Sequence, residues 1–173
     1  QVLRRLGRTE EAKAQLMLAA GLDESIGVAW ATLAAIALDE NKPDIVLQHI
    51  RRARALEPGN ISYRVIEAKG LRRLNRPADA LTLLGALPDN ERAVLEVVEE
   101  MALCYGLTNK PAEAASLYVH ACDRNPNDGR VALTAAEWLE RAGDRASALA
   151  RAEHAAMLGQ PGAREMVARL KGE

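Results

Sequence analysis

The chain has 173 residues, of which 49% are hydrophobic, and this is enough apolar material to form a buried core. Only 3% of the residues are aromatic and none is Phe, so the core must consist of small and aliphatic side chains, which favours close-packed helices over a β-sandwich or barrel. The 23 basic and 24 acidic residues give a net charge of -1, so the chain as a whole lacks the basic footprint of a nucleic-acid-binding protein.

The sequence repeats every 34 residues without an insertion or a deletion. Within each period the apolar residues recur at three- and four-residue spacings, which indicates helices, and no stretch alternates long enough for a strand. One column of the repeat holds turn-forming residues: Gly7, Asn41, Asn75, Asn109 and Gly143. Another holds alanine throughout: Ala34, Ala68, Ala102 and Ala136. A fixed period of this length predicts a solenoid, in which each supersecondary unit is stabilised by stacking on its neighbours.

Residues 1–25 are predicted to form a partial repeat that lacks most of its first helix. The first full repeat covers residues 27–60, and its first helix is expected over 26–39. Asn41 ends that helix, because asparagine tolerates the left-handed conformation found after a helix C-terminus. Pro43 follows at the first turn of the second helix, where its missing N–H costs nothing. Each repeat is therefore predicted to be an antiparallel helix hairpin with a tight turn.

The repeat over residues 61–94 departs from this pattern. Arg64 and Glu67 occupy columns that should be large and apolar, whereas Tyr63 and Ile66 lie one residue earlier. We therefore expect the first helix of this repeat to be rotated or shifted.

The second helix of the same repeat is predicted to be cut short by Gly85 and Pro88. Asp89 or Asn90 can cap the next helix, which we expect to start early, to run over residues 90–107 and to be the longest in the chain. Repeats over 95–128 and 129–162 follow, and a last helix over 163–171 is expected to cover the exposed edge.

The sequence offers little that points to catalysis. It contains no zinc-protease, paired-cysteine, nucleophile-elbow or phosphate-loop motif, and we predict no enzyme activity, no cofactor and no metal site. Cys104 and Cys122 are interpreted as small buried hydrophobic residues rather than a redox pair. Three histidines are predicted to face solvent: His49, His120 and His154.

The repeated residues resemble the tetratricopeptide-repeat (TPR) pattern, whose period is also 34. The matching residues are Trp30, Leu33, Ala34, Ala37, Val46, Ile50 and Pro58, and again Val98, Met101, Ala102, Tyr105, Ala114, Tyr118 and Pro126. The resemblance covers essentially the whole chain. It implies an all-α solenoid of antiparallel hairpins wound into a right-handed superhelix, as a single domain over 1–173. Because the chain begins at Gln1 within a repeat, we expect it to be a piece of a longer protein.

The resemblance also implies a function, because TPR proteins bind extended or helical peptide segments in a concave groove formed chiefly by their first helices. The residues expected to contact a protein or peptide partner are Val28, Ala31, Ala35, Leu38, Val65, Lys69, Arg72, Glu96, Glu99, Leu103, Leu133 and Glu137. This groove would be apolar at one end, basic in the middle and acidic beyond. As an alternative, the basic residues Lys69, Arg72 and Arg73 pair with the acidic residues Glu96, Glu99 and Glu100 across a helix interface.

Several functions remain open at this stage. The leading interpretation is a protein-binding scaffold similar in composition to bacterial arrays of envelope assembly, pilus biogenesis and exopolysaccharide export. The family's clamp for peptide C-termini is not reproduced, since Ala31, Ala35 and Val65 stand where polar residues are needed. The alternatives are an RNA-binding helical-repeat module, opposed by the charge and the few aromatic residues, and a regulatory domain of an enzyme. No apolar run or signal peptide predicts membrane insertion by this segment. The sequence leaves open whether the protein is in the cytoplasm or the periplasm. It also leaves open the oligomeric state.

Overall fold

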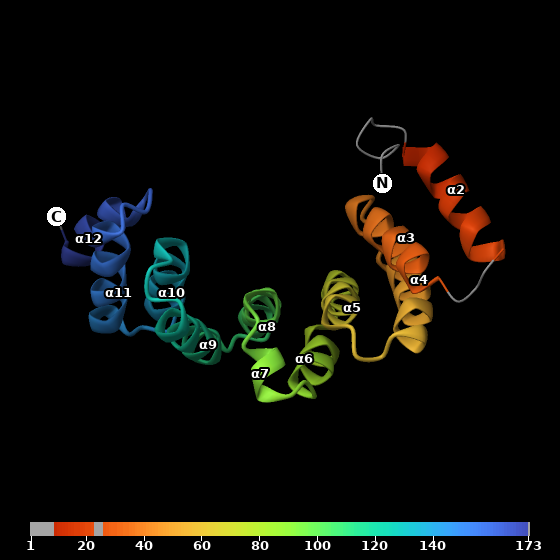
Figure 1. Cartoon of the computed structure of the whole chain (residues 1–173). Coiled ribbons are helices and arrows are strands. Elements are labelled where there is room, and N and C mark those ends of the chain that lie inside the picture. Colours follow the sequence, from red (N-terminus) through yellow and green to blue (C-terminus); the bar gives the residue numbers. More distant parts are fainter. Residues whose placement is uncertain (1–8, 23–25, 173) are drawn as a thin grey trace. The chain divides into compact units, whose positions relative to one another are not determined.

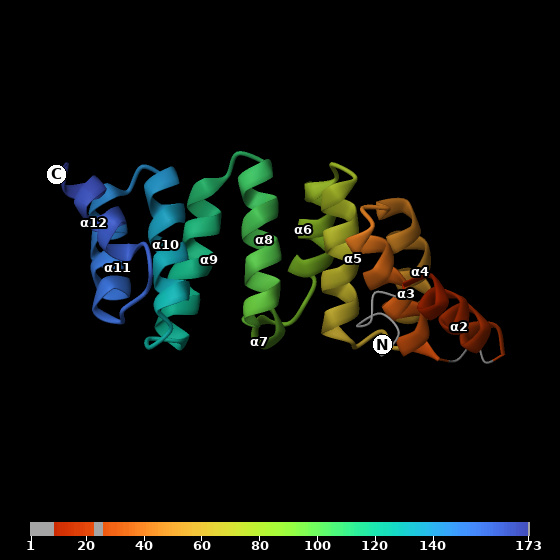
Figure 2. The same cartoon turned by 90° about the horizontal axis from the view of Figure 1, so that it is seen from above.

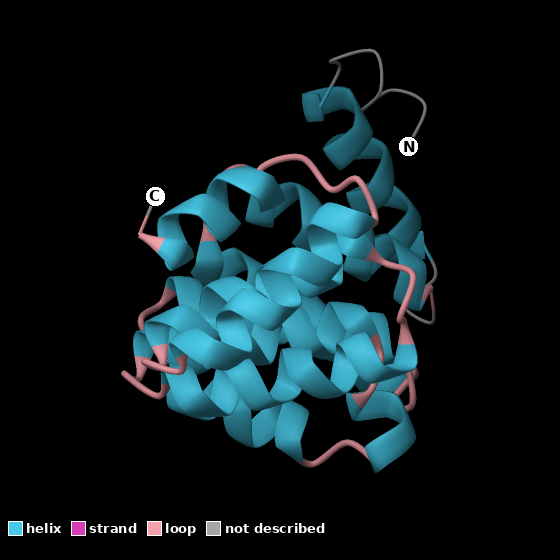
Figure 3. Ribbon diagram, turned by 90° about the vertical axis from the view of Figure 1, so that its left-hand side faces the viewer, coloured by secondary structure: helices cyan, strands magenta, loops and turns pink. Residues whose placement is uncertain are grey.

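The computed structural model describes residues 9–22 and 26–172, which form eleven helices and no strand (Figure 3). The chain divides into two compact units, Gln1–Leu87 and Pro88–Glu173, which we describe one at a time (Figure 1). This all-α succession of hairpins confirms the predicted fold class, while the handedness of a superhelix over the whole chain stays a prediction.

The first unit contains five helices in the described residues (Figure 2). They are α2 (Thr9–Leu22), α3 (Gly27–Asp39), α4 (Pro43–Leu56), α5 (Ile61–Arg73) and α6 (Pro77–Gly85). Each packs on the next along the chain up to α6, and α3 also contacts α5. Helix α2 is the described part of the partial repeat predicted over residues 1–25.

The second unit contains six helices in its described part. They are α7 (Asp89–Arg92), α8 (Leu95–Leu107), α9 (Pro111–Arg124), α10 (Gly129–Arg141), α11 (Arg145–Met157) and α12 (Ala163–Lys171). Helix α9 packs against both α8 and α10, and α11 packs against α10 and α12. Helix α12 buries Ala163, Met166 and Leu170.

The turns between the paired helices confirm the prediction from the asparagine column. Asn41, Asn75 and Asn109 have φ values of 55°, 58° and 56°, and Gly143 has a φ of 86°. In each turn the following N–H donates to the carbonyl five residues earlier at 2.9 Å, which closes the helix C-terminus. Because the same turn recurs, the first helices of successive repeats begin 34 residues apart. The second helices of successive repeats also begin 34 residues apart. Gly7, in the same column, lies outside the described residues.

The alanine columns are buried. Ala34, Ala68, Ala102 and Ala136 are all fully buried, as is Ala114 on a second helix. A side chain of one carbon lets neighbouring helices approach closely, so we expect these positions to tolerate a larger residue poorly.

Replacing Ala102 by leucine is therefore expected to lower the free energy of unfolding by about 1 to 3 kcal/mol, because the added carbons overpack the interface. Ala112, which is exposed on α9, provides the matched control, and Ala112→Leu is expected to change little. Thermal unfolding followed by circular dichroism measures both variants. An unchanged melting temperature for Ala102→Leu would show that this position tolerates a larger side chain.

The structure corrects the prediction of one long helix over residues 90–107. Helix α7 ends at Arg92, and α8 begins separately at Leu95. Between them Val94 has an extended backbone, with φ -64° and ψ 130°, and this interrupts the helical path. The longest helices in the described residues are instead α2, α4 and α9, with 14 residues each.

The structure also contradicts the predicted rotation of the helix over residues 61–73. Helix α5 starts in phase with the other first helices, and the positions it buries match those that α3 buries. Glu67 is therefore buried at 5% exposure in the same column as Leu33, while Arg64 and Ile66 are half-buried. The helix keeps its phase because neighbouring charges compensate the carboxylate, as described below.

Candidate partner-binding surfaces

In the first unit, the predicted contact residues divide into exposed and buried ones. Val28 on α3 is 60% exposed, and Ala35 and Leu38 on the same helix are half-buried. Val65 on α5 has no exposed surface and Ala31 is also buried, so both belong to the core rather than to a contact surface. Hydrophobicity patterns alone cannot separate a groove position from a core position on a helix that is covered on two sides.

The basic residues of this unit lie on α5. Lys69 and Arg72 are half-buried, and both already take part in polar interactions of the protein. Arg73 is exposed and donates a hydrogen bond to the main-chain carbonyl of Leu38 on α3. The alternative in which these residues pair with acidic residues of α8 would join the two units, and it stays a prediction.

In the second unit, α8 and α10 present the acidic residues. Glu96, Glu99 and Leu103 on α8 are exposed, as is Glu137 on α10, whereas Leu133 on α10 is half-buried. Leu103 is 45% exposed, a large value for a leucine at the middle of a helix in a packed repeat. Glu99 and Glu137 make no ion pair or hydrogen bond in the part of the chain that the structure describes.

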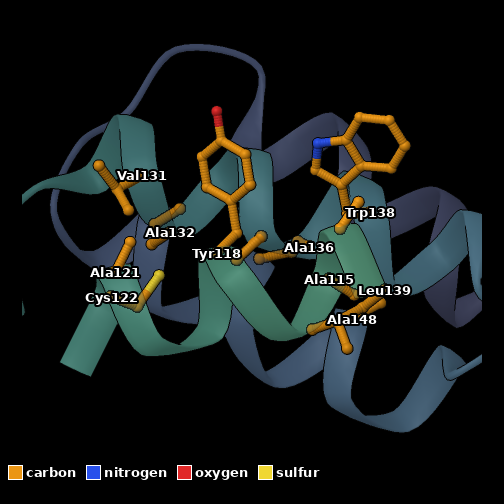
Figure 4. Close-up of a cluster of buried hydrophobic side chains, with 14 of the residues drawn as sticks. Ala115, Tyr118, Ala121, Cys122, Val131, Ala132, Ala136, Trp138, Leu139 and Ala148 are labelled. Atoms are coloured by element: carbon orange, nitrogen blue, oxygen red, sulfur yellow. The ribbon is translucent and has the colours of Figure 1, made fainter. Parts of the chain in front are cut away.

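Tyr118 lies on α9, the helix that packs against both α8 and α10. Its side chain is 6% exposed and belongs to the core of the second unit, with the hydroxyl at the far end from its neighbours Ala121 and Cys122 (Figure 4). Burial raises the pKa of Tyr118 to about 12, and Glu99 and Glu137 contribute to the increase while Arg130 opposes it. Glu99 on α8 and Glu137 on α10 thus lie within electrostatic range of one hydroxyl group.

We refer to Glu99, Leu103, Leu133, Glu137 and the Tyr118 hydroxyl as the α8–α10 face. Sequence analysis identified the first four residues from the helical spacing. It did not identify the hydroxyl, because Tyr118 lies on a second helix and matches a core position of the TPR pattern.

The ring of Trp138 on α10 lies close to Gly106 on α8. A methyl group built on Gly106 would lie 2.6 Å from Cη2 of the Trp138 ring, so only glycine fits there without displacing the ring. The ring is 7% exposed, and the guanidinium of Arg141 lies 4.7 Å from its centroid.

The histidines differ from the prediction that all three face solvent. His120 is exposed, but His49 and His154 are half-buried. The ring of His49 stacks on Trp30 with centroids 5.5 Å apart, and its Nδ1 is buried without a hydrogen-bond partner. Burial, together with the nearby charge of Arg52, lowers the pKa of His49 below its usual value. This histidine is therefore neutral at physiological pH and forms part of the packing.

The buried carboxylate of Glu67 is held by two arginines of α4. Arg51 Nε donates to Glu67 Oε1 at 3.1 Å, and Arg54 donates to the other carboxylate oxygen. The charged residue in an apolar column was the sequence signal for this contact. Its partners could not be identified from the sequence because many arginines lie on the same helix.

The described residues also contain a surface cavity and two buried cysteines. A surface cavity of about 550 Å³ lies between α9, α10 and α11, but its polar residues have structural partners, since Asp144 caps α11 and Arg151 pairs with Asp123 at 3.1 Å. Cys104 and Cys122 are buried and form no disulfide bond, and the Cys104 thiol donates to Glu100 Oε1 at 3.9 Å. No group of three or more potential metal ligands occurs in the described ranges. None of the helices there has the length and apolarity needed to cross a bilayer.

Comparison with solved structures identifies the fold. YrrB, described as a TPR protein with an unusual peptide-binding site, superimposes with a TM-score of 0.73 at 18% identity over 99% of this chain and 88% of its own. This chain has the tetratricopeptide-repeat fold. PilF of Pseudomonas aeruginosa also superimposes on this chain, with a TM-score of 0.78 and 27% identity over 98% of this chain and 78% of PilF.

PilW, described as a widely conserved type IV pilus biogenesis factor, has a TM-score of 0.79 to this chain at 18% identity, over 98% of this chain and 81% of PilW. No protein-family model matches the sequence, and no curated protein matches it significantly. The TPR assignment therefore depends on the helix geometry and on the repeat columns.

Proposed function

We propose that this TPR chain is a non-enzymatic scaffold that binds a segment of a partner protein on the exposed faces of its first helices. Those helices are α3 and α5 in the first unit and α8 and α10 in the second. The fold supports the proposal, because stacked helix hairpins expose one face of each first helix. YrrB, with the same fold, is described as having a peptide-binding site.

The observation that carries the proposal is the exposure of apolar side chains on first helices beside charged ones. Leu103 lies one helical turn from Glu99, and Val28 occupies the corresponding face of α3. Interfaces between proteins combine a few apolar anchors with a charged rim, which is the arrangement these helices provide.

A finer proposal concerns the cellular setting. The similarity in fold to PilW, described as a type IV pilus biogenesis factor, favours a role in the assembly of a bacterial envelope structure, with type IV pilus biogenesis as the specific candidate. Fold similarity alone does not define function, so the partner must be identified directly.

Site-specific photo-crosslinking tests the scaffold proposal. A photo-reactive amino acid at Leu103 is expected to link to one defined segment of a partner in cells that contain the protein, and mass spectrometry identifies that segment. The same group at His120, which is exposed on the second helix α9, serves as the matched control and is expected to link less. Cross-links formed only from His120, or from neither position, would contradict binding on the first helices. A pilus or envelope component as the linked protein would support the finer proposal.

A further inference from the structure

We propose that the α8–α10 face of the second unit binds a cationic segment of the partner, in which lysine or arginine alternates with apolar residues, and that the Tyr118 hydroxyl donates a hydrogen bond to that segment. This inference depends on the proposed function and specifies the chemistry of the partner at one of its surfaces.

The first argument is the uncompensated charge of the face. Glu99 and Glu137 are exposed from two different helices and have no ionic partner within the described residues. Arg130, the one cation among the described residues that acts on the pKa of Tyr118, is at the start of α10 and forms an ion pair with Asp128 at 3.6 Å. Glu140, one turn beyond Glu137, pairs with Arg169 at 2.7 Å. Glu99 and Glu137 therefore keep their negative charge on this face, where it attracts cations and repels acidic segments.

The second argument is the hydroxyl of Tyr118. Its ring is nearly completely buried, whereas the hydroxyl oxygen is reachable by solvent and makes no hydrogen bond within the described part of the chain. Because the packed ring holds this hydroxyl in one place at the surface, the hydroxyl loses little conformational freedom when it donates to a ligand. With a pKa of about 12, the phenol is protonated at neutral pH and acts as a donor. A main-chain carbonyl of a bound segment is a suitable acceptor.

The third argument is the apolar part of the face. Leu103 is exposed beside Glu99, and Leu133 is half-buried beside Glu137. The apolar contacts that these leucines offer would otherwise remain in water. An extended segment with alternating basic and apolar side chains can contact the carboxylates and the leucines in turn.

Peptide binding to the complete chain tests this inference. The probes are three fluorescent peptides of equal length in which leucine alternates with arginine, glutamate or glutamine. We expect the arginine peptide to bind, with an affinity that decreases as salt increases, and the glutamate peptide not to bind. The variant Glu99→Gln combined with Glu137→Gln is expected to weaken binding of the arginine peptide about tenfold or more. Tyr118→Phe is expected to weaken it by roughly three- to tenfold without changing the salt dependence.

A matched control removes the same charge elsewhere. Glu113 on α9 and Glu165 on α12 are exposed, and replacing both by glutamine is expected to leave binding of the arginine peptide nearly unchanged. Circular dichroism confirms that each variant remains folded. Equal loss in this control, equal binding of the three peptides, or no binding of the arginine peptide would overturn the inference. If Leu103 cross-links to a partner segment that is acidic or uncharged, the inference fails while the scaffold function stands.

Discussion

Replacing Trp138 by alanine is expected to lower the free energy of unfolding of the second unit by about 3 to 5 kcal/mol. The ring is almost fully buried within the core formed by α8 to α12, and its removal leaves a cavity that the surrounding helices cannot fill. Arg141 also loses its contact with the ring. Urea unfolding followed by circular dichroism measures the change, and Trp30, the other tryptophan, reports on the first unit by fluorescence.

The contact between Trp138 and Gly106 provides a sharper control. Glycine to alanine inside a helix usually stabilises a protein by up to about 1 kcal/mol. Here the added methyl group would lie 2.6 Å from the ring, so Gly106→Ala is expected to destabilise the unit instead. In the Trp138→Ala background the same change is expected to become neutral or favourable, because the obstructing ring is absent. Additive effects of the two substitutions would show that the two residues do not contact each other in solution.

Replacing both Arg51 and Arg54 by methionine is expected to destabilise the first unit by about 3 to 5 kcal/mol, because it leaves the buried Glu67 carboxylate without a counter-charge. Adding Glu67→Met should restore most of this loss, since the equivalent positions in other repeats are Leu33 and Met101.

Thermal and urea unfolding of the double and triple variants measure this rescue. Arg64→Met serves as the control and is expected to have a small effect. It removes a positive charge from α5, but Arg64 is not one of the two arginines that pair with Glu67. If the triple variant is no more stable than the double variant, the arginines stabilise the unit by packing and not by compensating Glu67.

Much of the fold follows from local sequence chemistry. The turn residues Asn41, Asn75 and Asn109 set the helix ends, because few other residues tolerate a positive φ. Proline at the start of three second helices sets where those helices begin. The phase of the hairpins and the buried alanine columns could therefore be predicted residue by residue.

Predictions failed where the outcome depended on contacts between distant residues. The sequence pattern suggested that α5 rotates to keep Glu67 in water, but two arginines of another helix compensate the carboxylate and keep the phase. Val65 was expected on a surface and is buried, because neighbouring helices cover that part of α5. Val94 interrupts a helix that local capping signals favoured, because its backbone is extended.

The same division applies to the candidate site. Helical spacing in the sequence is sufficient to select Glu99, Leu103, Leu133 and Glu137 as residues of first helices, because side chains three or four positions apart share a helix face. Only the tertiary structure brings a tyrosine of the intervening second helix into range of both carboxylates. That proximity depends on how α9 packs between α8 and α10, and packing of this kind is decided by side chains far apart in the chain, which no local pattern records.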